Sequence, residues 1–132
     1  VGMIGRAEVI DLRQQFLAES ERVTCISGSA FNPSWTEKVE REGRRLLILS
    51  EGVMMYWEEA EVQKFLSILS EGFNELEAHF DLLYKGLVHR SSRHDVLKHM
   101  QAEFKWGVTD GSEVVRWRRH GNSWTVSISL MR

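Results

Sequence analysis

A hydroxyl, a carboxylate and a glycine, Ser50, Glu51 and Gly52, directly follow the apolar run 46–49. A strand with one wet face would alternate, so the run predicts a strand covered on both faces, as in a parallel sheet flanked by helices. In open α/β sheets, ligands bind at the carboxyl ends of the strands. The pattern therefore indicates a candidate binding edge; a buried strand followed by a plain polar turn is the alternative.

The other reactive side chains form no recognisable catalytic or metal-binding pattern. Cys25 lies in the short β-branched segment 22–27, and we predict a small core residue there rather than a nucleophile. His89, His94 and His99 are spaced so that successive side chains lie about 140° apart around a helix, and the three cannot share a face. We therefore expect no metal site and assign no catalytic residue.

Periodic apolar residues predict the elements that carry this edge. A packing helix is expected at 8–17, a strand at 22–27, and a helix after Asn32, whose side chain is a candidate N-cap before Pro33. The strand 44–50 is expected to be central in the sheet and parallel to 22–27. The apolar stripe of the first helix consists of Val9, Ile10, Leu12, Phe16 and Leu17.

The second half of the chain continues this alternation of elements. A helix after Trp57 should bury one face and end at Gly72, and strict alternation over 75–83 predicts a strand with one wet face. Ser92 and Asp95 resemble a capping box that opens a further helix. The buried faces are expected at Val62, Phe65, Leu66, Leu69 and Phe73, and then at Leu76, Ala78, Phe80 and Leu82.

The C-terminal residues predict an antiparallel hairpin. Asp110-Gly111 is a turn signal, 113–118 is followed by a loop at 120–123, and the residues from Trp124 to Leu130 alternate strictly. The basic residues at 116–119 are interpreted as edge-strand charges rather than a nucleic-acid patch.

The composition is that of an ordinary soluble globular chain. It has 132 residues, 42% hydrophobic and 27% charged, with a net charge of −2 and a single cysteine. The balanced charge gives no reason to expect nucleic acid or an acidic membrane as partner, and no apolar run approaches the ~18 residues of a membrane span. We expect one domain in a reducing, cytoplasmic environment.

The segment 50–56, Ser-Glu-Gly-Val-Met-Met-Tyr, resembles the motif after the fourth strand of the leucine carboxyl methyltransferase family, most closely its tetracenomycin-type O-methyltransferase branch. The segments 8–13 and 106–111 extend the resemblance in order. It implies a Rossmann-like class I three-layer α/β sandwich that uses S-adenosylmethionine. The likeness covers only the second half of that domain, so 1–132 is expected to be a single partial domain, truncated at the N-terminus and without the Gly-rich cofactor loop.

The resemblance also implies positions for the ligands. Ser29, Ala30, Ser50, Glu51 and Gly52 would line the cofactor cleft. The chain departs from the family at three places: Gly5 stands where a carboxylate is expected, and Ser29 and Asn32 replace two acids. The residues that would face the substrate are Met54, Tyr56 and Trp57.

Two functions follow from these observations. One is an S-adenosylmethionine-dependent O-methyltransferase acting on a small molecule or a carboxyl group. The other is a non-catalytic scaffold that self-associates through exposed sheet edges. Without the first strand of the family's domain, the strand 44–50 would expose an apolar edge. The strand 22–27 could close this gap within one chain, or the edge could pair with a second copy through a two-fold or swapped interface; we expect the homodimer.

Overall fold

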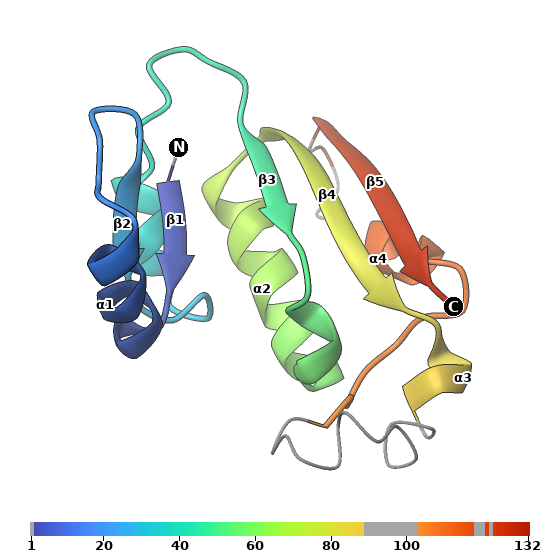
Figure 1. Cartoon of the computed structure of the whole chain (residues 1–132). Coiled ribbons are helices and arrows are strands. Elements are labelled where there is room, and N and C mark those ends of the chain that lie inside the picture. Colours follow the sequence, from blue (N-terminus) through green and yellow to red (C-terminus); the bar gives the residue numbers. More distant parts are fainter. Residues whose placement is uncertain (1, 89–102, 118–120, 122) are drawn as a thin grey trace. The chain divides into compact units, whose positions relative to one another are not determined.

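The computed structural model describes residues 2–88, 103–117, 121 and 123–132 (Figure 1). The chain divides into two compact units, residues 1–42 and residues 43–132. The histidines at 89, 94, 99 and 120 and the capping box at 92–95 lie outside the described residues.

The first unit is a β–α–β arrangement. Strand β1 (Gly2–Gly5) pairs in parallel with β2 (Thr24–Ser27), and helix α1 (Ala7–Phe16) connects them. A 3-10 helix follows at Pro33–Lys38, and the Asn32 side chain accepts a hydrogen bond from the Ser34 N–H at 3.1 Å. The predicted N-cap is confirmed.

Helix α1 buries less than its apolar stripe predicts. Ile10 is the buried residue of the helix, whereas Phe16 is 77% exposed and the other stripe residues are more than half exposed. The reason is geometric: two strands of four residues offer little surface for a helix of ten residues to cover. The prediction of a helix that packs along this stripe is wrong for the first unit. The exposed members are Val9, Leu12, Phe16 and Leu17.

The second unit contains a three-stranded parallel sheet in the order β3-β4-β5. Its strands are β3 (Leu47–Ser50), β4 (Glu75–Leu83) and β5 (Ser123–Met131). A 3-10 helix at Met54–Tyr56 and helix α2 (Glu59–Gly72) connect β3 to β4. Helices α3 (Lys85–Val88) and α4 (Ser112–Arg116) lie between β4 and β5. The chain is therefore α/β with small parallel sheets.

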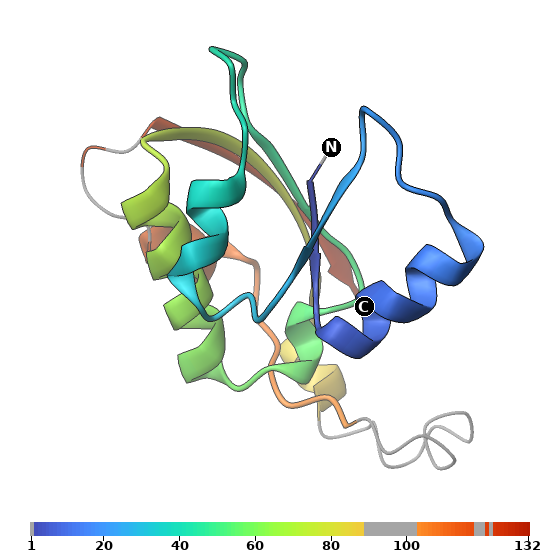
Figure 2. The same cartoon turned by 90° about the vertical axis from the view of Figure 1, so that its left-hand side faces the viewer.

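The core of the second unit lies between the sheet and its helices. Helices α2 and α4 lie on the same face of the sheet (Figures 1 and 2). Strand β4 alternates between exposed and buried residues as predicted, and α2 ends at Gly72 as predicted. The predicted apolar faces are confirmed, since the following residues are all buried: Val62, Phe65, Leu66, Leu69, Phe73, Leu76, Ala78, Phe80 and Leu82.

Strand β3 differs from the prediction. It forms one end of the sheet β3-β4-β5, whereas β2 pairs with β1 in a separate sheet, so β3 is not central. Leu47 is 52% exposed and Leu49 is 64% exposed. The two residues are in register with Glu77 and His79 of β4, which are also exposed, so they lie on the exposed face of the sheet. The expected burial of both faces is therefore wrong.

The C-terminal residues also differ from the prediction. Strand β5 pairs in parallel with β4, with Glu75 opposite Ser123 and Leu83 opposite Met131. Parallel strands need a long crossover rather than a tight hairpin, and residues 84–122 supply it. Part of this crossover is α4, so the antiparallel hairpin is corrected to a parallel pair with a helix in the connection.

Candidate functional site

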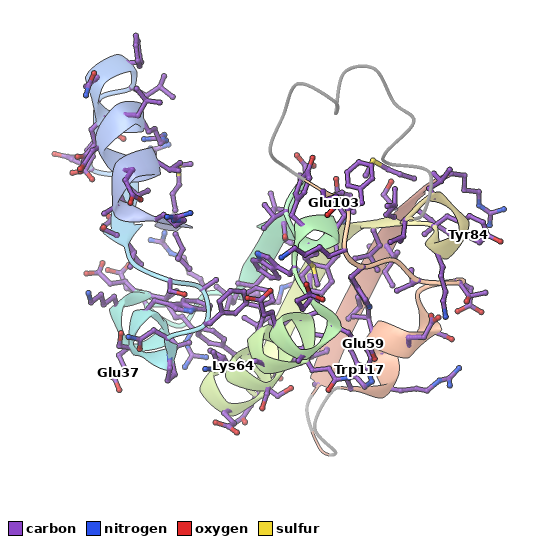
Figure 3. The ribbon with its side chains drawn as sticks, turned by 90° about the horizontal axis from the view of Figure 1, so that it is seen from below. Glu37, Glu59, Lys64, Tyr84, Glu103 and Trp117 are labelled. Atoms are coloured by element: carbon purple, nitrogen blue, oxygen red, sulfur yellow. The ribbon has the colours of Figure 1, made fainter. Side chains whose placement is uncertain are left out.

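The residues after β3 form a turn that the neighbouring strand holds in place. Gly52 adopts a left-handed conformation with φ +68°, and its N–H donates to the carboxylate of Asp81, with 2.9 Å to each oxygen. Ser50 pairs with Phe80, so Asp81 lies one residue nearer the carboxyl end of β4. Figure 3 views the molecule from below, where these strands end, and labels Tyr84, the residue after β4. Two neighbouring parallel strands therefore bring polar groups to one edge.

Glu51 is the most accessible charged group of this turn. Its side chain is exposed, and in the part of the chain that the structure describes it forms no hydrogen bond or ion pair. The Ser50 side chain is half-buried and likewise makes no described hydrogen bond. A Cβ built on Gly52 would meet no atom within 4 Å, so the space above this glycine is open. The edge therefore offers an acceptor carboxylate and a hydroxyl beside open space at Gly52.

The backbone N–H of Gly52 is not available to a ligand, because Asp81 already accepts its hydrogen bond. Sequence reasoning missed Asp81, whose position in the alternating strand marked it only as a wet-face residue. Its distance of 29 residues from Gly52 leaves no local signal. The parallel register of β3 and β4 is what brings the two together.

The residues predicted to face a substrate lie in packed surroundings. Met54 has no exposed surface, so its side chain belongs to the core in this structure. Tyr56 packs against Phe104, with ring centroids 5.4 Å apart. The Trp57 and Phe65 rings pack edge-on, with ring centroids 5.3 Å apart. Both aromatic residues remain half-exposed.

The backbone of this segment is fixed from a distant part of the chain. The Met55 carbonyl accepts hydrogen bonds from the N–H groups of Lys105 at 2.8 Å and Trp106 at 3.3 Å. The ammonium of Lys105 also lies 3.4 Å from the Glu58 carboxylate. The residues after the candidate edge therefore have a structural role that is visible in their contacts.

Ser29 and Ala30 lie in the first unit and build the start of its 3-10 helix. The Ser29 hydroxyl accepts from the Phe31 N–H at 3.2 Å, and the Ala30 carbonyl accepts from the Trp35 indole N–H at 3.1 Å. They follow β2, so they too stand at the carboxyl end of a parallel strand. Ser29 and Ala30 therefore belong to a different compact unit from Ser50, Glu51 and Gly52, which lie in the second unit.

A second polar cluster surrounds Cys25, which is half-buried rather than fully buried. A guanidinium nitrogen of Arg13 lies 3.5 Å from its sulfur, and the Glu19 carboxylate accepts from its backbone N–H at 3.1 Å. This hydrogen bond from the Cys25 backbone, together with one from the Gln14 side-chain amide, lowers the pKa of Glu19 below its ordinary value. Sequence reasoning did not find the Arg13 contact, because it joins a helix to a strand.

The described residues contain no cluster of three or more His, Cys, Asp or Glu side chains able to hold a metal ion. Among these same residues, no helix combines the length and apolar character that a membrane crossing needs. Comparison with known proteins finds no matching family model, no matching curated protein and no matching solved structure.

Proposed function

We propose that the chain contributes part of the cofactor cleft of an S-adenosylmethionine-dependent O-methyltransferase. The observation that carries the proposal is the edge where β3 and β4 end, with an exposed Glu51 carboxylate beside open space at Gly52. Parallel sheets bind ligands at this edge. A carboxylate that lacks a protein partner is suited to accept hydrogen bonds from ribose hydroxyls.

Methyl transfer requires little general acid or base catalysis. Methyl transfer is a displacement at a sulfonium carbon, and it depends on alignment of acceptor and donor. The absence of an assigned catalytic residue is therefore compatible with the proposal. Glu51 and Ser50 would hold and orient the cofactor, and the acceptor would be a small molecule or a carboxyl group near Tyr56 and Trp57, which are both half-exposed.

Calorimetric titration with S-adenosylhomocysteine tests this proposal directly. The wild-type chain should bind, and Glu51→Ala should weaken binding at least tenfold, about 1.4 kcal/mol. Glu75→Ala is the matched control, because Glu75 is also exposed but begins β4, at the opposite end of the strand. Absence of binding by the wild-type chain, or equal affinity of a folded Glu51→Ala variant, would reject the assignment.

A second candidate function is a non-catalytic scaffold that self-associates as a homodimer. The observation that favours it is the exposure of Leu47 and Leu49 on a strand at the end of its sheet. Unpaired strand edges template the addition of another strand. Sedimentation velocity at micromolar concentration should give a dimer, and a monodisperse, cooperatively folded monomer would exclude this function.

A further inference from the structure

Strand β4 pairs with one edge of β3, and no described strand pairs with its other edge, called the free edge below. The Leu46 carbonyl accepts a hydrogen bond from the Glu77 N–H on β4 at 2.9 Å. Because backbone groups of successive strand residues point to alternate sides, those of Ile48 also point to β4. The N–H and C=O groups of Leu47 and Leu49 then point the other way, where no strand is paired among the described residues.

The exposed side chains at alternate positions along this strand form a self-complementary pattern, in which a second copy in the opposite direction would match apolar with apolar residues and basic with acidic residues. Residues two apart in a strand share a face, so Leu47 and Leu49 lie together on β3. Arg45 and Glu51 continue the same spacing on either side of the strand, and all four residues are exposed. Arg45 and Glu51 form no hydrogen bond or ion pair within the part of the chain that the structure describes. The pattern therefore runs from a cation through two leucines to an anion.

We propose that the free edge of β3 pairs with β3 of a second copy, antiparallel and about a two-fold axis at Ile48. This inference rests on the self-association function. In this register Leu47 lies opposite Leu49 of the second copy, and Arg45 lies opposite Glu51 of the second copy. The axis repeats each pair, so both leucines and both charges of each copy find a partner of matching chemistry.

The alternation of the backbone limits the registers that can compete. Only residues whose backbone groups point outward can exchange hydrogen bonds, so the strands slip in steps that keep odd-numbered residues opposite each other. An axis at Leu49 would set Leu47 against Glu51 of the second copy. An axis at Leu47 would set Arg45 against Leu49 of the second copy. Both alternatives place a charge against a leucine and lose the ion pairs, so the pattern specifies the axis at Ile48.

Cysteine cross-linking distinguishes these registers in a Cys25→Ser background. Ile48→Cys should form a disulfide-linked dimer, because a non-hydrogen-bonded antiparallel pair brings Cα atoms within about 4.5 Å. Leu47→Cys and Leu49→Cys should each fail to cross-link with themselves, because their Cα atoms would be more than about 7 Å apart. A mixture of these two variants should cross-link.

Charge exchange supplies an independent readout. Arg45→Glu and Glu51→Arg should each weaken the dimer about tenfold, and the double variant should restore the wild-type association. Glu71→Arg, on an exposed position of α2, is the control and should leave association unchanged. Failure of the double variant to restore association would overturn the proposed pairing.

The outcomes separate this inference from both proposed functions. A dimer that cross-links through Leu49→Cys or Leu47→Cys alone overturns the register and keeps self-association. A monomeric wild-type chain overturns both. Glu51 also belongs to the cofactor proposal, so association is measured without cofactor, and Arg45→Glu tests the interface through a residue outside the proposed cofactor cleft.

Discussion

The Asp81 carboxylate accepts the N–H of Gly52 with both oxygens 2.9 Å from the nitrogen, although the two residues are 29 positions apart. This contact joins the turn after β3 to the neighbouring strand. It ties Gly52, which has a left-handed backbone conformation, to β4. The candidate site is therefore shaped by a residue outside its own segment.

Removal of this acceptor should loosen the turn. Asp81→Ala should lower the free energy of unfolding by about 1–2 kcal/mol, because a charged acceptor is lost and the Gly52 N–H keeps only solvent. Asp81→Asn keeps one acceptor oxygen and should cost less. Urea unfolding of the two variants measures the difference, and equal stability of Asp81→Ala and the wild type would contradict the role given to this contact.

Alanine substitution at two glycines with positive φ separates the cost of backbone strain from the cost of steric crowding of the new Cβ atom. Gly52 has φ +68° and open space, whereas a Cβ on Gly111, at φ +84°, would lie 2.6 Å from the Ile128 Cδ1 atom. Gly52→Ala should cost about 1–2 kcal/mol from backbone strain alone. Gly111→Ala should cost more.

The crowding can be relieved without changing the backbone. Ile128→Val removes the Cδ1 atom, so it should recover part of the loss in a Gly111→Ala background. Additive effects of the two substitutions in thermal or urea unfolding would show that crowding by Ile128 does not contribute.

Elements whose signal is local were predictable from the sequence. The alternation along β4 and the single apolar face of α2 each predict which side of that element is buried. Both predictions are confirmed. The Asn32 cap follows from neighbouring residues in the same way. In each case the residues that define the feature are within one element or its first turn.

Sheet neighbours were not predictable, because they depend on distant residues. The run at β3 is apolar on both sides, but the number of covered faces is set by the elements around it, and Leu47 and Leu49 lie on the exposed face. The same holds for β5, whose alternation is equally compatible with parallel and antiparallel partners. Within the candidate site, Ser50 and Glu51 were readable from their position after a strand, whereas Asp81 required the register.

The two faces of α1 should respond very differently to substitution. Ile10→Ala removes a buried side chain and should cost about 2–5 kcal/mol. Phe16→Ser alters a side chain that is 77% exposed, so it should change the free energy of unfolding by less than about 0.5 kcal/mol. Comparable losses in the two variants would indicate that the exposed stripe is covered in solution.

The start of α4 should weaken in acid. The Glu113 carboxylate accepts from the backbone N–H groups of Thr109 at 3.0 Å and Gly111 at 3.1 Å. The Thr109 hydrogen bond is the main cause that lowers the pKa of Glu113 below its ordinary value of 4.5, although desolvation and the like negative charge of Asp110 act to raise it. A lowered pKa in the folded chain means that this stabilisation is complete above pH 4.5 and is lost as the pH falls through the folded value.

The neighbouring Asp110 contributes in the same direction. Its carboxylate accepts from the Ser112 N–H at 2.9 Å, and hydrogen bonds from Ser112 lower the pKa of Asp110 below 3.8. Glu113→Gln should therefore flatten the acid side of the stability curve in part, and adding Asp110→Asn should flatten it further. Urea unfolding at several pH values between 3 and 7 measures both slopes. An unchanged slope in Glu113→Gln would mean that protonation of Glu113 does not contribute to the acid sensitivity of the fold.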